Sequence, residues 1–245
     1  NDTKVVNARL IFKTSSGKTI EIFCLEPVRP QVTFAQDPPV EWSCMVGNLK
    51  AWKWKEEVLR SGFAIGGTEY TLNAELTSQN PDANIINFSW EPPGISFAEV
   101  LASGGFIPLP PYVKRAPVEE DKKTYQTIYA VHEGSVAAPT AGLHFTDVVI
   151  NSLRQKKSNI RNITLHVGAG TFKPVKSEKI TEHEMHSERF SLSRKVIESI
   201  ISGQKGRIIS VGTTTLRTIE SVYWYGVQLH QGRAAAGEEA YISQW

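Results

Sequence analysis

The chain has 245 residues, of which 40% are hydrophobic and 21% are charged, and its formal net charge is +2. This is the composition of a globular protein with room for one large domain or two modest ones, and its overall charge does not indicate a nucleic-acid binder. The two cysteines, Cys24 and Cys44, exclude a disulfide framework and a cysteine metal site, leaving two buried thiols or one bridge. No apolar run approaches the roughly 18 residues of a membrane span, and no signal peptide is visible, so we expect a cytoplasmic protein.

Residues 1 to about 95 are predicted to form a small β-barrel or sandwich. Short segments with strand character alternate with turns that contain Gly, Asn, Asp and Pro. The turn Ser15-Ser16-Gly17 indicates a hairpin between the first two segments. The expected strands cover residues 5–13, 18–25, 42–46, 63–65, 69–76 and 85–90.

From about residue 96 the pattern changes to alternating helices and strands, which is the sequence form of an α/β layer domain. Gly104-Gly105 is expected to end the first helix, and Thr146 is expected to cap a helix with a one-sided apolar stripe. The other helices are expected at residues 97–103, 196–202 and 214–225, and the strands at residues 160–167 and 207–211.

A loop rich in small residues covers residues 134–145, with the sequence Gly-Ser-Val-Ala-Ala-Pro-Thr-Ala-Gly-Leu-His-Phe. Pro139 and the glycines on either side of it favour a loop, and the helix that follows offers free N–H groups to an anion or a polar ligand. His144 near its end is either part of a binding site or a buried, hydrogen-bonded side chain of a tight loop. Histidine is suited to the first role because it moves protons near neutral pH.

A second histidine, His166, ends an expected strand just before Gly168-Ala169-Gly170-Thr171. Ligands gather beyond the C-terminal ends of strands in α/β proteins, and this position favours a functional role for His166. The pair Gly168 and Gly170 lacks the third glycine and the following helix of a dinucleotide-binding fingerprint.

The segment 183–188, with the sequence His-Glu-Met-His-Ser-Glu, carries two more histidines and two glutamates. Its histidines are three residues apart, whereas the zinc-binding helix motif His-Glu-x-x-His separates them by four, so no metal site is predicted. Acid–base chemistry or substrate hydrogen bonding by His186 and Glu188 is the favoured interpretation. A solvated loop is the alternative for His183 and Glu184.

Gly212-Thr213-Thr214-Thr215 follows the expected strand 207–211 and opens a helix. Its hydroxyl and N–H groups suit a carboxylate or a phosphate, although threonine that only caps the helix is an equally common arrangement. Each of the four segments joins the end of an element to a loop rich in small residues. We therefore expect them to meet in one cleft of the α/β domain: 134–145, 165–175, 183–188 and 211–217.

Positive charge is concentrated locally, where it could neutralise RNA phosphates. In the segment 50–55, lysines alternate with Trp52 and Trp54, which indicates either base stacking or, as the favoured interpretation, one packed face of a strand. The other basic positions are Lys114, Arg115, Arg154, Lys156, Lys157, Arg161, Lys173, Lys176 and Lys179.

The four segments together closely resemble the S-adenosylmethionine:tRNA ribosyltransferase-isomerase family of queuosine biosynthesis. Further matches follow in order along nearly the whole chain, at residues 1–3, 8–10, 109–112, 114–115, 125–127 and 129–130. The segment 134–145 is long and specific to this family. The family's N-terminal segment ahead of Asn1 and its C-terminal Asn-Phe-His-Leu-Pro region are missing. Because the chain also begins without methionine and ends at Trp245 inside an expected strand, we expect a fragment, or the ordered part, of a longer chain.

The resemblance implies an α/β domain of residues 1–10 and 96–245 with an inserted small β-barrel domain of residues 11–95. It implies a transferase and isomerase that moves the ribosyl group of S-adenosylmethionine onto 7-aminomethyl-7-deazaguanine at the wobble position of tRNA, giving epoxyqueuosine, adenine and methionine. S-adenosylmethionine is then a consumed substrate, no cofactor or metal is expected, and we expect a monomer. The implied catalytic residues are His144, His166, His186 and Glu188. The implied substrate-binding residues are Arg115, Pro139, Thr140, Ala141, Gly142, Gly168, Gly170, Thr171, Thr213 and Thr214.

This reaction needs two or three titratable groups near neutral pH. A base must remove a proton from the ribose 5′ carbon next to the sulfonium, and adenine needs a proton or a hydrogen-bond donor at its ring nitrogens. The acceptor amine must be neutral to attack. The histidines and Glu188 can supply these groups.

Two other classes fit the sequence less well. A radical or methyl-transferring S-adenosylmethionine enzyme would need Cys-x-x-x-Cys-x-x-Cys cluster ligands or a Rossmann glycine fingerprint, and the sequence has neither. A non-catalytic RNA-binding barrel with an appended domain leaves the histidine-rich loops unexplained.

Overall fold

The chain divides into two compact units in the computed structural model. One, called here the barrel unit, is Val5–Lys123, and the other, called the histidine unit, combines Asn1–Lys4 with Thr124–Trp245. Along the sequence, the barrel unit therefore interrupts the histidine unit. The structure describes residues 1–29, 37–53, 56–80, 83–110, 112–172, 177–183, 185–202, 206–237 and 240–243.

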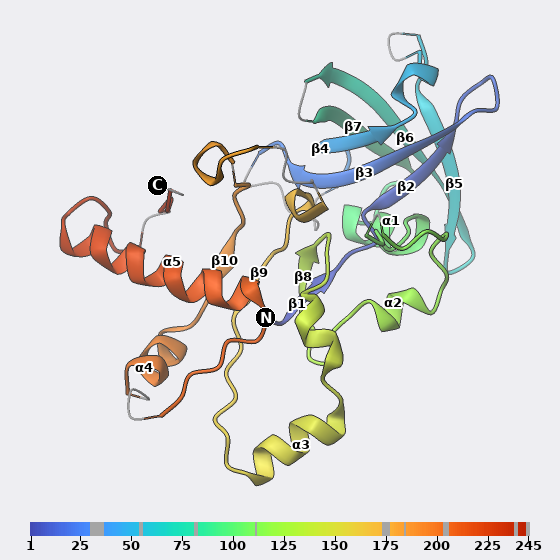
Figure 1. The fold of residues 1–245 in the computed structure, drawn as a ribbon. Coiled ribbons are helices and arrows are strands. Elements are labelled where there is room, and N and C mark those ends of the chain that lie inside the picture. Colours follow the sequence, from blue (N-terminus) through green and yellow to red (C-terminus); the bar gives the residue numbers. More distant parts are fainter. Residues whose placement is uncertain are drawn as a thin grey trace. The chain divides into compact units, whose positions relative to one another are not determined.

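The strands of the barrel unit form a closed antiparallel barrel in the order β2–β3–β4–β7–β6–β5 (Figure 1). Every second residue of β7 is buried, because successive side chains of a strand point to opposite faces. Gly17 has a φ of 78°, which suits the tight turn between β2 and β3. The strands are β2 (Arg9–Lys13), β3 (Thr19–Pro27), β4 (Val40–Gly47), β5 (Leu59–Ile65), β6 (Thr68–Gln79) and β7 (Asn84–Glu91).

Helix α1 (Phe97–Gly104) packs into the core of this barrel unit. It begins at a capping box, in which the Ser96 side chain accepts a hydrogen bond from the Glu99 backbone N–H and the Glu99 carboxylate accepts one from the Ser96 N–H. Phe97 is fully buried, and its ring centroid lies 5.3–5.8 Å from the rings of Trp42, Phe88 and Trp90. These aromatic contacts tie the helix to strands β4 and β7.

The observed division of the chain differs from the predicted domain ranges at both boundaries. Residues 5–10 and 96–123 belong to the barrel unit, whereas the sequence assigned them to the α/β domain. Besides the packing of α1, the backbones of Arg9 and Phe106 exchange hydrogen bonds of 2.8 and 3.2 Å. This bridge joins the chain after α1 to the barrel strand β2.

The strands predicted between residues 18 and 90 are all present, and several are longer than predicted. The predicted strand 5–13 is instead split into β1 (Thr3–Val5) and β2. The strand interpretation of Trp52 is wrong, because Trp52 directly follows the short 3-10 helix η1 (Leu49–Ala51). Its indole N–H donates a 3.0 Å hydrogen bond to the Glu57 carbonyl, and the side chain is buried. Trp52 is therefore a packing residue, as favoured, while Trp54 and Lys55 lie outside the described residues.

Cys24 and Cys44 face each other across β3 and β4, and both are buried free thiols. Burial raises the pKa of the Cys44 thiol well above its ordinary value, and a hydrogen bond with Cys24 raises it further. Of the two arrangements left open by the sequence, the structure has the buried thiols.

The histidine unit combines short strand pairs with helices. Strand β1 pairs with β8 (His132–Ser135), and β9 (Thr164–Leu165) pairs antiparallel with β10 (Phe190–Ser191). The core cluster of this unit contains Ala137, Ile163, Leu165, Val167 and Val196. The helices are α3 (Asp147–Gln155), α4 (Arg194–Ser202) and α5 (Thr213–His230), and the 3-10 turns are η2 (Thr140–His144), η3 (Ala169–Phe172) and η4 (Ile180–Glu182).

The predicted helices of the histidine unit are confirmed, but its predicted strands are mostly wrong. Thr146 caps α3 by accepting a 3.3 Å hydrogen bond from the Val149 N–H. Of residues 160–167 only Thr164–Leu165 is strand, and residues 207–211 form none. Ile208 and Ile209 are 54% and 81% exposed, so no layer of described residues covers them. The described part of the chain thus confirms a closed barrel together with a unit of helices and short strands.

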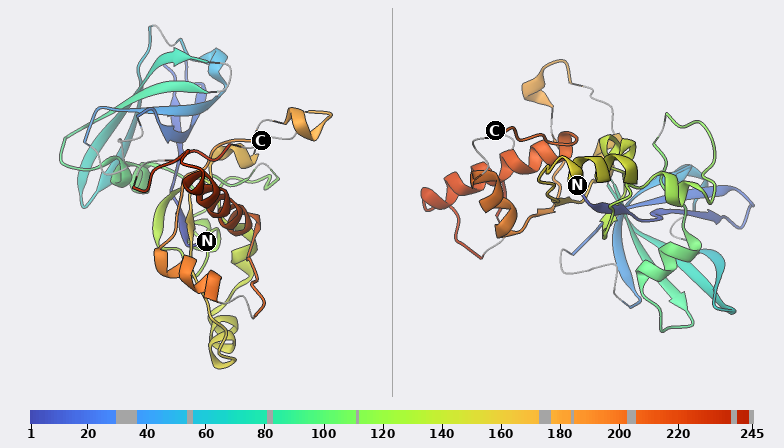
Figure 2. Two further views of the ribbon diagram at one scale, coloured as in Figure 1. Left: turned by 90° about the vertical axis from the view of Figure 1, so that its left-hand side faces the viewer. Right: turned by 90° about the horizontal axis from the view of Figure 1, so that it is seen from below.

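Helix α5 is the longest helix of the described chain, and its N-terminal end lies next to β9 and β10 (Figures 1 and 2). The C-terminal end of α5 lies farther from these strands (Figure 1). None of the described helices is both long and apolar enough to cross a membrane.

Candidate active site

The two strands β9 and β10 bring two of the predicted segments together. Leu165 pairs with Phe190, and the His166 N–H donates a 2.9 Å hydrogen bond to the Arg189 carbonyl. His166 and Glu188 therefore leave this strand pair at the same end. The antiparallel register places the segment 165–175 beside the segment 183–188.

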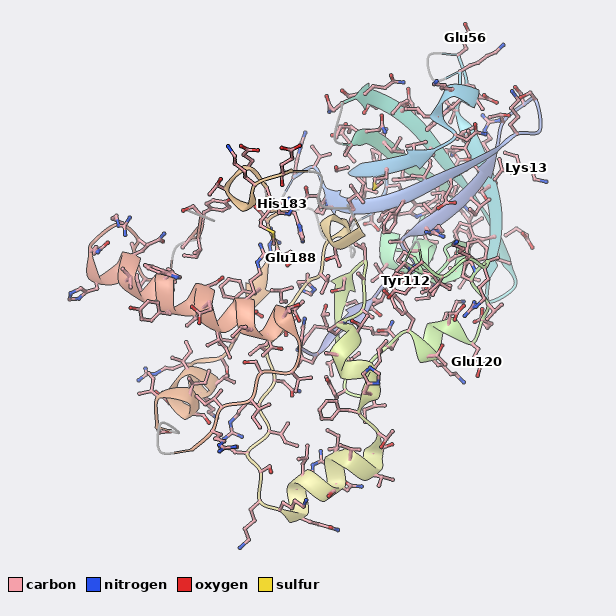
Figure 3. The ribbon with its side chains drawn as sticks, in the orientation of Figure 1. Lys13, Glu56, Tyr112, Glu120, His183 and Glu188 are labelled. Carbon is pink, nitrogen blue, oxygen red and sulfur yellow. The ribbon has the colours of Figure 1, made fainter. Side chains whose placement is uncertain are left out.

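Glu188, labelled in Figure 3, accepts hydrogen bonds from three different residues of the histidine unit. Its side chain is 4% exposed and accepts a 2.6 Å hydrogen bond from Arg217 Nη1. It also accepts hydrogen bonds of 3.1 Å from the Gly168 N–H and from His186 Nε2. Arg217 Nη2 donates a further 2.7 Å bond to the His186 carbonyl. One carboxylate thus hydrogen-bonds to the residue before η3, to the segment 183–188 and to α5.

These contacts fix the orientation of His186. A carboxylate oxygen only accepts hydrogen bonds, so His186 Nε2 is the donor to Glu188. The ring packs on Gly170, where an added Cβ would overlap it. Gly170 is thus required for the close approach of the His186 ring to the η3 backbone.

His166 is held by a different set of contacts. Its Nδ1 lies 3.1 Å from Thr3 Oγ1, and its ring closes over Gly134. A Cβ at Gly134 would lie 2.7 Å from Nδ1, and the φ of 141° at this residue also disfavours any side chain. Burial lowers the pKa of His166, and the positive charge of Arg189 lowers it further. His166 is therefore a neutral imidazole near neutral pH.

The segment 134–145 begins as strand, not as the loop that was predicted, because Gly134 and Ser135 belong to β8. The remainder turns through buried residues into η2, where a Cβ at Gly142 would lie 2.5 Å from the Tyr129 hydroxyl. His144, the last residue of η2, is exposed, and its imidazole hydrogen-bonds no described residue. The alternative of a buried, hydrogen-bonded His144 is therefore wrong.

The start of α5 completes the meeting of the segments. A Cβ at Gly212 would lie 3.4 Å from that of Ala141, so the loops 134–145 and 211–217 touch. Gly212 occupies the N-cap position without a side-chain cap. Thr213 is exposed, and Thr214 Oγ1 accepts a 3.3 Å bond from the Asn1 side-chain amide. The first N–H groups of α5 therefore lack the threonine cap that was the alternative interpretation.

Together, contacts of described residues link all four predicted segments within the histidine unit. Gly134 meets His166, Gly168 meets Glu188, and Gly212 meets Ala141. The bond from Arg217 to Glu188 links the segments 211–217 and 183–188. The four segments are thus in contact, while the predicted cleft between them stays a prediction. Of the proposed substrate-binding residues, those in this region are Pro139, Thr140, Ala141, Gly142, Gly168, Gly170, Thr171, Thr213 and Thr214.

Arg115 belongs to the barrel unit, where it has a structural partner. Its guanidinium donates two 2.7 Å hydrogen bonds to the carboxylate of Asp121, at the start of α2 (Asp121–Thr124). The Val118 N–H donates a third bond, of 2.8 Å. The Arg115 hydrogen bonds, with that of Val118, lower the pKa of Asp121 to about 2.

Several residues of the site were not singled out from the sequence. Arg217 lies inside the segment 211–217, but its pairing with Glu188 depends on the position of α5. The Asn1 side-chain amide bonds both the N–H and the carbonyl of Leu165 at 3.0 Å, as a neighbouring strand would. The Thr3 hydroxyl lies within hydrogen-bond distance of the His166 ring, and the Ser135 hydroxyl lies within hydrogen-bond distance of Thr3. The signal available for the first residues was the resemblance of Asn1-Asp-Thr to the family.

A metal site was not predicted, and the described residues contain no group of three or more histidine, cysteine or acidic side chains that could hold a metal ion. His186 instead pairs with Glu188, while Glu184 lies outside the described residues, as do Lys173 and Lys176.

The described unit thus has two histidines with contrasting environments, a buried carboxylate paired with arginine, and glycines that admit close approach, and we take it as the candidate active site. Residues 1–241 match the protein family described as queuosine biosynthesis protein. The chain belongs to this family.

Three similar proteins carry the name S-adenosylmethionine:tRNA ribosyltransferase-isomerase. That of Sulfurihydrogenibium sp. (strain YO3AOP1) is 36% identical over 92% of this chain and 62% of its own length. That of Thermodesulfovibrio yellowstonii is 39% identical over 90% of this chain and 59% of its own. That of Clostridium kluyveri (strain ATCC 8527) is 42% identical over 91% of this chain and 60% of its own. The chain thus spans about 60% of the length of these curated relatives. No solved structure matches it significantly.

Proposed function

We propose that this chain carries the catalytic site of an S-adenosylmethionine:tRNA ribosyltransferase-isomerase. The enzyme would transfer and isomerise the ribosyl group of S-adenosylmethionine onto 7-aminomethyl-7-deazaguanine at the tRNA wobble position, giving epoxyqueuosine with release of adenine and methionine. The observation that carries the proposal is the meeting of four segments, two of them bearing His166 and the His186–Glu188 pair. The names of the relatives support the choice of reaction.

The contacts divide the candidate catalytic residues into two kinds. Glu188 already accepts bonds from Arg217, Gly168 and His186, so its lone pairs are largely occupied and it holds His186 in place. His166 and His186 are the groups suited to proton transfer or to hydrogen bonding with a reacting atom. His144, exposed at the end of η2, is proposed as a third such group.

The chemistry assigns these groups three tasks. A base removes the proton of the ribose 5′ carbon, which the neighbouring sulfonium acidifies. Adenine leaves with the electron pair of its glycosidic bond, and methionine leaves with the electron pair of the sulfur–carbon bond. The neutral acceptor amine bonds to the ribosyl group and gives up one proton to a base. A donor at the adenine ring lowers the energy of its departure. No cofactor is needed, because S-adenosylmethionine is itself consumed.

Contacts with the substrates are proposed for two groups of residues. The small residues at positions 139–142, the glycines of η3 and the threonines that open α5 allow a ligand to approach backbone N–H groups. Arg115 and the basic residues of the histidine unit are proposed to meet tRNA phosphates. A cytoplasmic, monomeric protein stays a prediction.

Product analysis tests the proposal directly. The protein is incubated with S-adenosylmethionine and a tRNA that carries 7-aminomethyl-7-deazaguanine, and the small molecules and the tRNA nucleosides are identified by mass spectrometry. Free adenine, methionine and epoxyqueuosine in equal amounts are expected. S-adenosylhomocysteine would show a methyltransferase instead, and tRNA binding without any product would show a non-catalytic RNA-binding protein.

A further inference from the structure

A continuous chain of hydrogen bonds leads from the backbone to the ring of His166. The Val167 N–H donates a 2.7 Å bond to Ser135 Oγ, which lies 2.6 Å from Thr3 Oγ1. Thr3 Oγ1 lies 3.1 Å from His166 Nδ1 and 3.4 Å from the His132 carbonyl. Thr3 and Ser135 are both fully buried, so these groups depend on one another for hydrogen bonds.

Counting protons leaves two possible arrangements of donors in this series of hydrogen bonds. Ser135 Oγ accepts from Val167, and its own proton has one close acceptor, Thr3 Oγ1. Thr3 then donates its single proton either to His166 Nδ1 or to the more distant His132 carbonyl. The shorter distance favours Nδ1, which makes Nδ1 an acceptor and places the ring proton of His166 on Nε2.

We propose that Thr3 and Ser135 are positioning residues that hold His166 as the neutral Nε2–H tautomer, so that His166 serves the reaction as a hydrogen-bond donor through Nε2 and not as a base. The charged form would need an N–H at Nδ1, and this N–H would face the hydroxyl proton of Thr3. The hydroxyl chain therefore disfavours protonation of the ring.

The surroundings of His166 support the same state. Burial and the positive charge of Arg189 oppose a charged ring, and the opposing influence of Asp2 is smaller. Gly134 keeps the ring at the end of the hydroxyl chain, since a Cβ there would displace Nδ1. Nε2 hydrogen-bonds none of the described residues, so its proton is available to a ligand.

The chemical role rests on the proposed function, whereas the tautomer does not. A neutral donor suits a substrate atom that gains negative charge, such as a ring nitrogen of the departing adenine. In that case His186 and His144 are the histidines left to act as bases.

The tautomer can be measured without substrate by two-bond ¹H–¹⁵N correlation spectra of the ¹⁵N-labelled protein, with His166→Gln used to assign the signals. The expected result is a protonated Nε2 and an unprotonated Nδ1 that persist well below the ordinary histidine pKa. A proton on Nδ1 at neutral pH would overturn the proposal.

Variants then test whether the hydroxyls cause this state. Thr3→Val keeps the shape of the side chain but removes the donor, so mixed tautomers, a raised pKa of His166 and a turnover loss of about 10-fold are expected. Thr3→Ser keeps the hydroxyl and should keep the single tautomer, the lowered pKa of His166 and the turnover of the unmodified protein. Thr218→Val removes another buried hydroxyl of this unit, one that only bonds the Thr214 carbonyl, and should leave the His166 signals unchanged.

The outcomes separate the claim about the His166 tautomer from the claim about the reaction. Unchanged tautomer and pKa in folded Thr3→Val would overturn the positioning role, and so would failure of Thr3→Ser to keep them. If the spectra follow the expectation but the unmodified protein releases no adenine, the proposed function fails and the hydroxyl chain stands. If Thr3→Val does not fold, the spectra of the unmodified protein and of Thr3→Ser still decide.

Discussion

At the scale of single residues, Glu188 is a buried carboxylate that accepts hydrogen bonds from three neighbouring residues. Replacing it by glutamine keeps its shape but places an amide against donors, and it leaves the Arg217 guanidinium without its carboxylate. Hydrogen bonds to charged groups contribute about 1.5–3 kcal/mol, so Glu188→Gln should lower the free energy of unfolding by about 2 kcal/mol. Glutamine has one acceptor oxygen where Glu188 has two, so either Arg217 or His186 faces the new NH2 group, and turnover should fall about 10–100-fold as His186 loses its fixed position.

The matched control is Glu198→Gln, which breaks the exposed pair with Arg194 on α4. Exposed ion pairs of this spacing contribute roughly 0.3–0.5 kcal/mol, so urea denaturation should barely distinguish this variant from the unmodified protein. An equal loss of unfolding free energy in the two variants would show that the buried contacts of Glu188 do not stabilise the protein.

The glycines under the two histidine rings allow a second prediction. Gly134→Ala and Gly170→Ala each place a Cβ against an imidazole, so the ring must move away from its hydrogen-bond partner. A misplacement of about 1 Å in a catalytic group can cost roughly 100-fold, and a loss of this order is expected in turnover.

Gly226→Ala is the control, because a Cβ at this position in α5 meets nothing within 4 Å. Alanine is the better helix former by about 1 kcal/mol, so this variant should be slightly stabilised and fully active. Full activity of Gly170→Ala would show that the position of the His186 ring does not matter.

At the scale of elements, the sequence predicted strands well in the barrel unit and poorly in the histidine unit. In β6 and β7 the period-two pattern coincides with turns at both ends, so local signals and packing agree. Residues 160–167 and 207–211 have strand-forming side chains, but a strand also needs a hydrogen-bonding neighbour. Among the described residues of these two segments, only Thr164–Leu165 forms a strand ladder, opposite β10. Helix α3 was predicted from its cap and needed no such partner.

The segment from Arg115 to α2 makes a prediction about pH. The pKa of Asp121 is lowered from 3.8 to about 2, so the folded state binds its proton less readily than the unfolded state does. The Arg115 pair therefore stabilises the protein fully above pH 3.8, and this contribution is lost as the pH falls from 3.8 toward 2. Because Arg115 is about half exposed, solvent screens the pair and its contribution is expected to be small.

Denaturation of the unmodified protein and of Asp121→Asn across this range measures the effect. The difference between their free energies of unfolding should be constant above about pH 4.5 and should shrink toward pH 2. Glu119→Gln breaks the exposed pair with Lys122 and should show almost no difference at any pH. A difference that grows toward low pH would contradict the assigned sign.

At the scale of the whole molecule, the sequence indicated the segments of the candidate site because its histidines lie in loops between elements. It did not reveal Thr3, Ser135 or Arg217 as members, because threonine, serine and arginine are common and acquire meaning only from what they touch. Their roles depend on contacts between residues more than 25 positions apart, such as the bond from Arg217 to Glu188. The family resemblance identified the segments, and the structure identifies the partners within them.

The binding of tRNA is expected to involve the exposed basic residues at the end of α3 and just after it. Arg154, Lys156, Lys157 and Arg161 are all exposed, and Lys173 lies outside the described residues. Each phosphate contact that releases a counterion steepens the fall of affinity with salt by roughly 0.7–0.9 in a log–log plot. Replacing all four by glutamine should therefore weaken tRNA binding and flatten this slope by up to about 3.

The comparison variant is Lys50→Gln with Lys53→Gln, which neutralises the basic segment of the barrel unit. Affinity and salt slope are measured by fluorescence anisotropy with labelled tRNA, and S-adenosylmethionine binding by calorimetry serves as the control for folding of the site. If the four-residue variant keeps the original slope while the Lys50 and Lys53 variant loses it, the phosphates are held by the barrel unit. Because base extraction from an anticodon loop costs less than from a duplex, competition by duplex RNA of equal length should remain weak in either case.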